Sequence, residues 1–112
     1  MTAVTEPRYC QVVTTTDSAE AAGELARGVV EARLAACAQV AGPIVSTYRW
    51  QGRIESASEW QVTFKTAFDR YPALAAHIRA RHGYDVPEIL CLPVLGGDSS
   101  YLDWLDTETR PD

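Results

Sequence analysis

The sequence has few cysteines, and they are not spaced as in a structural metal site or a disulfide framework. Its 112 residues include three, Cys10, Cys37 and Cys91, an odd number with no C-x-x-C pair. Such a set argues against a small domain held together by disulfides or by zinc. Cys10 and Cys91 each lie within an apolar run, where cysteine behaves as a small buried residue.

The sequence also lacks a long apolar run and an excess of positive charge. No stretch approaches the roughly 20 apolar residues that cross a bilayer, and the opening residues MTAVTEPRY have neither a basic start nor an apolar segment. We therefore expect a cytoplasmic protein without a membrane partner. Lysine and arginine number 10 against 15 acidic residues, for a net charge of −5. Because nucleic-acid binding depends on positive charge, no nucleic-acid partner is expected.

What is present is typical of one small globular domain, with 46% hydrophobic and 22% charged residues. Tyr9–Thr15 is rich in β-branched residues and predicts a strand. Asp17 followed by Glu20 has the spacing of a capping box, so a helix should begin there. Apolar residues at helical spacing carry this helix to about Ala36 (Ala22, Leu25, Ala26 and Val29).

The middle of the chain predicts a long β-hairpin. Residues 37–50 read as extended, with a bulge or bend at Gly42-Pro43, because proline cannot donate to a sheet. Trp50–Arg53 has the composition of a tight turn in which Gly52 takes a positive φ. In the return strand, apolar residues alternate with polar ones, which indicates one buried face (Trp60, Val62 and Phe64 against Gln61, Thr63 and Lys65).

The last third of the chain predicts helix, strand and helix. Asp69 can cap a second helix whose first turn holds Pro72, and Gly83 can end it as a left-handed cap. Glu88–Leu95 is apolar on both faces, so we expect a strand that is central or covered on each side. Asp98 can cap a short terminal helix.

The predicted fold class is therefore α+β. The order βαββαβ followed by a C-terminal helix indicates a ferredoxin-like sandwich with both helices on one face of a four-stranded antiparallel sheet. We predict a flexible N-terminal tail over residues 1–8, a single domain over 9–108 and a C-terminal tail over 109–112.

The length of the hairpin predicts self-association. Residues 37–50 would span on the order of 45 Å when extended, whereas an 18-residue helix covers roughly 27 Å. The projecting part carries Tyr48, Trp50 and Trp60, large side chains that a monomer would expose. Pairing the arm with another copy covers these side chains and the open sheet edge, so a homo-oligomer is expected.

The chain resembles the CutA divalent-cation-tolerance family over about 100 residues. The similar segments occur in the family's order: LARGVVEARLAACAQV, VSTYRWQGRIE, FKT, HGYDVPEIL and YLDWLD. The resemblance implies a ferredoxin-like homotrimer whose long hairpins strap neighbouring subunits together. It also implies a cytoplasmic protein linked to tolerance of copper and other divalent cations, and not an enzyme.

The resemblance also bears on the metal ligands. Copper-binding members place a cysteine at the end of the first strand, a histidine pair before a Pro-Tyr, and a glutamate at the start of the last strand. Here Thr14, Arg81 and Gly83 replace the cysteine, the first histidine and the proline, while His82 and Glu88 remain. Because copper prefers thiolate and imidazole donors, we expect at most weak binding of copper or another divalent cation, through His82 and Glu88.

The segment RHGYDVPEIL, residues 81–90, has two interpretations. It is either a structural turn, in which proline keeps its predecessor extended and the helix dipole favours a protonated histidine, or one wall of a cleft. In the second case His82, Tyr84 and Glu88 face Tyr48, Trp50 and Lys65 of the same or a neighbouring chain. That cleft would suit a small polar or anionic ligand, or a weakly held hydrated metal ion.

Other functions of proteins with this element order fit less well. RNA-recognition domains need aromatic and basic residues that the third strand lacks. An acylphosphatase needs an arginine-bearing loop where this chain has TTTDSAE, and no nucleophile set stands out. A PII-like signalling or scaffold trimer shares the plan, although it carries a long loop where Gln51-Gly52 forms a tight turn.

Overall fold

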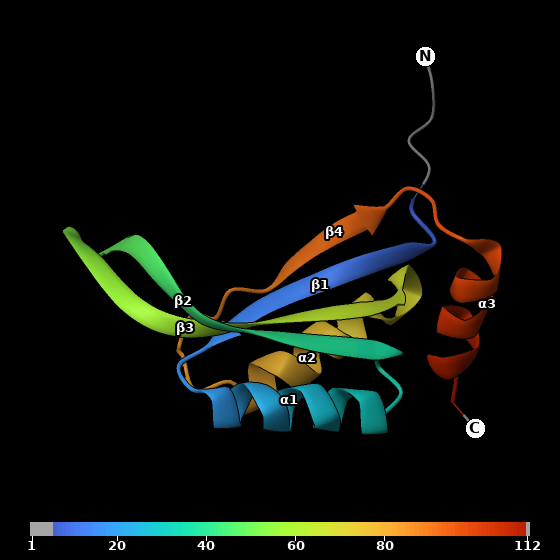
Figure 1. Cartoon of the computed structure of the whole chain (residues 1–112), viewed down its shortest axis with the longest axis horizontal. Helices are drawn as coiled ribbons and strands as arrows, with labels where there is room; N and C mark the ends of the chain where they lie inside the picture. Colours follow the sequence, from blue (N-terminus) through green and yellow to red (C-terminus); the bar gives the residue numbers. More distant parts are fainter. Residues whose placement is uncertain (1–5, 112) are drawn as a thin grey trace, which may run out of the picture.

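The computed structural model describes residues 6–111, and the element order is the predicted one (Figure 1). The elements are β1 (Tyr9–Thr16), α1 (Ala19–Glu31), β2 (Cys37–Trp50), β3 (Arg53–Ala67), a 3₁₀ turn η1 (Phe68–Arg70), α2 (Tyr71–Arg81), β4 (Leu90–Val94) and α3 (Ser99–Glu108). No helix in this part of the chain is long and apolar enough to span a membrane.

The four strands form one antiparallel sheet in the order β2-β3-β1-β4. Helices α1 and α2 lie side by side against one face of it, and α3 lies at the end of the sheet remote from the hairpin tip (Figure 1). The predicted α+β, ferredoxin-like fold with an extended hairpin and a C-terminal helix is confirmed.

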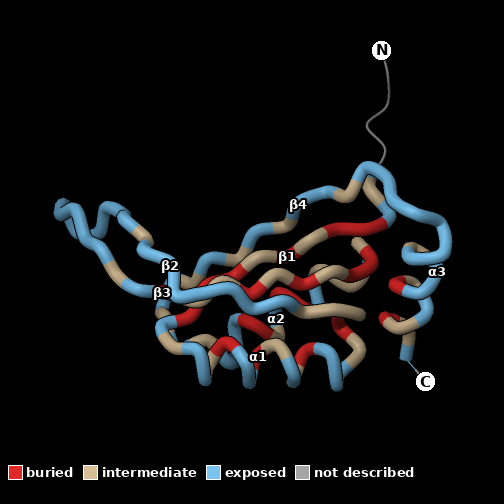
Figure 2. The backbone as a smooth tube through the Cα atoms, in the orientation of Figure 1, coloured by how far each residue is buried: buried red, intermediate tan, exposed pale blue. Residues whose placement is uncertain are grey.

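The core lies between the sheet and the two helices. Val62 and Phe64 of β3 are fully buried, as the alternation predicted, and they meet Val12 of β1 and Val29 of α1. Figure 2 shows buried segments in red along the sheet and on turns of the helices. A smaller cluster of Tyr9, Ala67 and Leu105 holds α3 against the end of the sheet.

Helix α1 is shorter than predicted at both ends. Its N-cap is Ser18, whose hydroxyl oxygen accepts a hydrogen bond from the backbone amide of Ala21 at 3.0 Å, so Asp17 is not the cap. The helix ends at Glu31 and not near Ala36, because Arg33 takes a positive φ of 59° and the amide of Leu34 bonds back to the carbonyl of Val29. This pattern is a Schellman motif with arginine at the usual glycine position.

Two capping predictions for α2 are wrong. The helix begins after η1, and its N-cap Arg70 makes no side-chain capping bond. The carboxylate of Asp69 instead binds Arg110 at 2.8 Å. Gly83 does not adopt the left-handed conformation, because the chain leaves α2 in an extended conformation at His82 (φ −77°, ψ 142°). The prediction of Pro72 in the first turn is confirmed.

The sequence pattern also predicted the wrong position for strand β4 in the sheet. It covers only Leu90–Val94 and lies at an edge, paired within the described residues with β1 alone, so the prediction of a central or covered strand is wrong for this chain by itself. Leu90 and Leu92 are 55% and 43% exposed on the face turned away from α1 and α2. An apolar strand at an open edge is a surface that another chain can cover.

The hairpin follows the prediction closely. Gln51 and Gly52 both take positive φ (50° and 78°), and the ladder is interrupted between Ala41 and Ile44 at the predicted bulge. Beyond the bulge the arm is pale blue, and so exposed, along most of its length (Figure 2). Trp60, however, does not belong to the exposed overhang: it packs against the core.

Residues 109–110, at the start of the predicted C-terminal tail, make contacts with the domain. Thr109 is fully buried, and its hydroxyl donates to the carbonyl of Leu105 at 2.9 Å. Arg110 bonds Asp69 and Asp106, both at 2.8 Å. Of the tail predicted at the other end, residues 1–5 lie outside the described residues. The backbone carbonyl of Arg8 accepts a hydrogen bond from the backbone amide of Phe68 at 2.8 Å.

Candidate functional site

The main cavity lies between the hairpin and the loop that joins α2 to β4. This loop passes under the base of the hairpin (Figure 1), and the cavity between them measures about 770 Å³. Its wall consists of residues from the hairpin, the end of β1 and the loop: Thr15, Ser46, Thr47, Tyr48, Arg49, Trp50, Glu59, Tyr84, Asp85, Val86, Pro87 and Glu88. The segment that the sequence singled out is therefore one wall of a cleft.

His82 has a structural task beside this cleft. Its Nε2 lies 2.6 Å from the carbonyl oxygen of Thr15, so this nitrogen must be the donor. The backbone amide of Tyr84 donates to Nδ1 at 3.0 Å, so that nitrogen is the acceptor. The two bonds select the neutral imidazole with its proton on Nε2, and a metal ion could bind His82 only after one of them breaks.

Tyr84 joins the loop to the hairpin. Its hydroxyl donates to Oε2 of Glu59 at 2.9 Å, and Glu59 is only 9% exposed. Burial, together with the bond to the carboxylate, raises the pKa of Tyr84 well above its usual range. The Tyr84 ring also packs against that of His82 at 4.8 Å between centroids. Glu59 pairs with Ile44, next to the bulge in β2, and it is buried despite its charge.

The predicted site residues are only partly brought together. The cavity is lined by four of them: Tyr48, Trp50, Tyr84 and Glu88. His82 lies beside it, where its Nδ1 accepts a hydrogen bond from the backbone amide of Tyr84. Lys65 lies elsewhere in its own chain: it pairs with Gln11 in the sheet, and its Nζ is 6.0 Å from the ring centre of Tyr101 on α3. A contribution of Lys65 from a neighbouring chain stays a prediction.

The charges of the cavity favour a cation over an anion. Three carboxylates, from Glu59, Asp85 and Glu88, face a single guanidinium, from Arg49. Sequence reasoning missed Arg49, Glu59 and Asp85, although Arg49 lies between the predicted residues Tyr48 and Trp50 and Asp85 directly follows Tyr84. Within residues 6–111 no three histidine, cysteine or acidic side chains converge as a metal cage would require. A divalent ion bound here would thus retain most of its water ligands.

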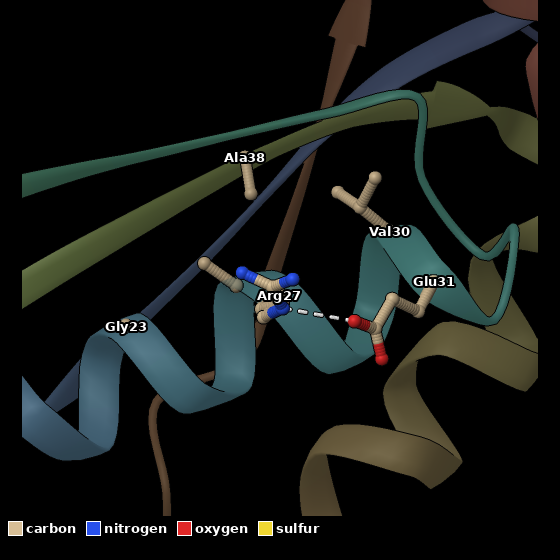
Figure 3. A pocket seen from close by; sticks show the side chains of 6 residues that line it. Gly23, Arg27, Val30, Glu31 and Ala38 are labelled. Carbon is tan, nitrogen blue, oxygen red and sulfur yellow. Dashed lines mark hydrogen bonds and ion pairs between the residues drawn. The ribbon is translucent and has the colours of Figure 1, made fainter.

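A second depression lies between α1 and the edge strand β2 and measures about 440 Å³. Figure 3 shows Gly23, Arg27, Val30 and Glu31 along the helix with Ala38 opposite them on the strand. Its one polar feature is the bond from Arg27 to Glu31 at 2.9 Å, an exposed pair of little energetic weight. With so few polar groups, it is a weaker candidate than the cavity under the hairpin.

The bond between Tyr84 and Glu59 supports a first prediction. Tyr84→Phe leaves a buried carboxylate without its donor, which should lower the free energy of unfolding by about 1–3 kcal/mol at neutral pH. Because folding raises the pKa of Tyr84, the stabilisation is present below the ordinary tyrosine pKa of about 10 and is lost as the pH rises above it. Urea unfolding at neutral and alkaline pH should therefore show a difference that shrinks as the pH rises.

The matched control for this experiment is Tyr101→Phe on α3, which removes an exposed tyrosine hydroxyl that makes no hydrogen bond within residues 6–111. It should leave stability unchanged at both pH values. Equal losses in the two variants, or a Tyr84→Phe loss that does not depend on pH, would contradict the role assigned to this bond.

The chain matches a family model described as CutA1 divalent ion tolerance protein over residues 10–108. It is 41% identical over 98 residues to the Divalent-cation tolerance protein CutA of Thermus thermophilus, covering 88% of this chain and 95% of that protein. It is 40% identical over 99 residues to the chloroplastic CutA protein of Arabidopsis thaliana, covering 88% of this chain and 54% of the relative. The chain thus spans about half the length of the plant relative.

Solved structures agree with the sequence relatives. The divalent cation tolerance protein of Thermus thermophilus superposes with a TM-score of 0.89 at 39% identity, covering 91% of this chain and 99% of that one. CutA1 of the psychrotrophic bacterium Shewanella sp. SIB1 superposes with a TM-score of 0.92 at 32% identity, covering 96% and 100%.

Proposed function

This chain belongs to the CutA1 divalent ion tolerance family, and from that premise we propose that it acts as a homotrimer that weakly binds a divalent cation, or a small polar ligand, in the cavity under its hairpin. Binding there would support tolerance of copper and other divalent metals without catalysis. The observation that carries the proposal is the cavity itself, where Glu59, Asp85 and Glu88 gather beside Tyr48 and Trp50.

Trimer formation is supported by the apolar surface that one chain leaves exposed. Val45 and Ile54 on the arm are 78% and 63% exposed, and Leu90 and Leu92 add a second patch at the β4 edge. Large exposed patches of this kind mark interaction surfaces. A hairpin that reaches a neighbouring subunit would bring its cavity against that subunit, as the resemblance to the family implied.

Two further parts of the proposal rest on chemistry. The residues that line the cavity include no cysteine or lysine, and no hydrogen bond joins the hydroxyl of Ser46 to a base within residues 6–111. The Tyr84 hydroxyl donates its proton to a hydrogen bond with Glu59. All three cysteines are free, which suits a reducing compartment, and we keep the cytoplasm as the proposed location. The plant relative is named as chloroplastic, so the compartment differs within the family.

Exchanging Glu88 tests the binding site. Isothermal titration of the wild-type protein with zinc, nickel and copper(II) should show weak saturable binding of at least one ion. Glu88→Gln should weaken it by about tenfold, equivalent to roughly 1.4 kcal/mol, because one anionic ligand is lost. The control Glu24→Gln removes an exposed carboxylate of α1, away from the cavity, and should change nothing.

Other outcomes of this titration are equally informative. If Glu88→Gln dissociates the subunits and leaves metal affinity unchanged, the residue is structural and the site is misplaced. If an intact trimer binds none of these ions, the metal role fails. A PII-like signalling or scaffold role would then be tested with nucleotides and other small polar molecules in the same calorimeter.

A further inference from the structure

One of the two histidines in the chain, His77, has a buried ring nitrogen without a partner. His77 lies in the middle of α2, and its Nε2 is shielded from solvent but makes no hydrogen bond within residues 6–111. Nδ1 of the same ring is also without a hydrogen bond in this part of the chain, but it is not among the shielded atoms, so it reaches solvent. The two nitrogens of one ring therefore have different surroundings.

The backbone of α1 at Gly28 faces the buried nitrogen. A Cβ at this position would lie 3.8 Å from Nε2, so the glycine lets the imidazole pack directly against the helix. The carbonyl oxygen of Gly28 already accepts the backbone amide of Ala32 at 3.1 Å. What α1 presents to Nε2 is thus mainly the Cα–H of the glycine, and we name this place, from His77 to Gly28, the helix contact.

These surroundings select one tautomer of the neutral ring. A neutral imidazole has one nitrogen that donates and one that accepts. With the proton on Nδ1, the donor is solvated and the lone pair of Nε2 points at a C–H group, a weak but favourable arrangement. With the proton on Nε2, an N–H donor would be buried without an acceptor, which costs free energy. His77 should therefore carry its proton on Nδ1, the opposite of His82.

We propose that His77 makes the packing of α1 on α2 sensitive to acid. While the ring is neutral, the two helices meet closely at Gly28. A proton taken from solvent binds Nε2, turns the buried lone pair into an N–H donor without an acceptor, and places a positive charge in the helix contact. Acidification should therefore loosen α1 from α2 at a pH at which the sheet is still intact, because local opening requires less free energy than global unfolding.

The charged groups around the helix contact do not favour the protonated ring. On α2, Nη1 of Arg81 donates to the carbonyl oxygen of His77 at 3.5 Å. On α1, Arg27 and Glu31 bond each other at 2.9 Å and are largely exposed, and Glu24 is exposed. The buried sheet residues that pack with the helices carry no charge (Cys10, Val12, Val62 and Phe64).

Burial and the charge of Arg81 both lower the pKa of His77 from the ordinary value of 6.5. Because the folded pKa is lower than the unfolded one, the stabilisation from the neutral ring is complete above about pH 6.5 and is lost as the pH falls through the folded value. In His77→Gln this loss should be absent. Between about pH 7.5 and about pH 5, the unfolding equilibrium constant of the wild type should rise roughly fivefold more than that of the variant, the low end for one unpaired donor.

Nuclear magnetic resonance of the histidine rings tests the tautomer in the full-length, unmodified protein. The two histidines give two sets of ring ¹⁵N signals, and His77→Gln assigns them. At neutral pH the proton should be on Nδ1 of His77 and on Nε2 of His82, and His77 should titrate below about pH 6.5. A proton on Nε2 of neutral His77, or titration at or above that pH, would overturn the proposal.

Hydrogen exchange read by mass spectrometry, corrected for the intrinsic effect of pH, measures the loosening itself. At about pH 5 the wild type should lose protection in α1 and α2 but not in β1. The loss should disappear in His77→Gln and persist in the control Ala76→Gln, which changes the adjacent, exposed residue of α2. An equal loss in His77→Gln, or none in the wild type, would contradict the proposed role. Should His77→Gln fail to fold, the midpoint of the loss in the wild type must coincide with the titration of His77, and a different midpoint would refute the link.

Discussion

Leu92→Glu is expected to convert the proposed trimer into folded single chains. In the isolated chain Leu92 is 43% exposed on the face of β4 turned away from α1 and α2, so a glutamate there should change the stability of the monomer by less than about 0.5 kcal/mol. In a trimer that covers this edge, the same glutamate would lose its water without gaining a partner. A cost of about 4 kcal/mol per contact would weaken association by roughly a thousandfold.

Sedimentation velocity at micromolar concentration measures this effect, and circular dichroism reports whether the variant remains folded. The control Ala76→Glu adds the same charge at an exposed position of α2, remote from both apolar patches, and should leave the trimer intact. A wild-type protein that sediments as a stable monomer would refute the assembly. So would a Leu92→Glu variant that remains trimeric, because the β4 edge would then lie outside the interface.

Gly42→Ala should lower the free energy of unfolding by about 1–3 kcal/mol, the usual range for overpacking a filled site. A Cβ at this position would lie 2.7 Å from Cγ of Trp60 and closer still to its Cδ1. The indole cannot swing aside freely, because it packs against the core beneath the sheet. One methyl group would therefore push the base of the hairpin away from the body of the protein.

Two comparison variants make this prediction specific. Gly23→Ala changes an exposed glycine inside α1 with open space around its Cβ position, and it should stabilise by about 0.5–1 kcal/mol through helix propensity. In a Trp60→Leu background, Gly42→Ala should lower the free energy of unfolding by less than it does in the wild type, because the indole atoms that the new methyl group would meet are absent. Denaturant unfolding at one fixed protein concentration measures the wild type and the four variants, the Trp60→Leu and double variants included. Equal costs in both backgrounds would show that Trp60 is not the obstacle.

Local sequence signals predicted the elements well where the backbone itself required particular residues. Gln51-Gly52 had to supply two positive φ values, and Asp98 caps α3 as expected. They failed where a tertiary contact decided the outcome. Asp69 looked like a cap and is instead paired with Arg110, 41 residues away, and Arg33 ends α1 in a conformation that nothing in its own chemistry favours.

The candidate site was predictable in outline only. The turn from His82 to Glu88 was identified, and the hairpin aromatics Tyr48 and Trp50 do face it. The sequence could not show that Glu59 is buried against Tyr84, because Glu59, beside the bulge in β2, and a loop residue 25 positions later must meet to create that bond. Nor could it show that Lys65 lies at the other end of the sheet, because that depends on the register of β3 on β1.

By itself, the sequence determined the order of strands and helices, the single domain, the tight hairpin and the family, because periodicity, turn residues and spaced motifs are local properties of the chain. Only the tertiary structure decided which side chains share a cavity and which tautomer His82 adopts. It also decided that β4 lies at an edge of the sheet. Those outcomes depend on strand order and register, through which residues far apart in the chain become neighbours.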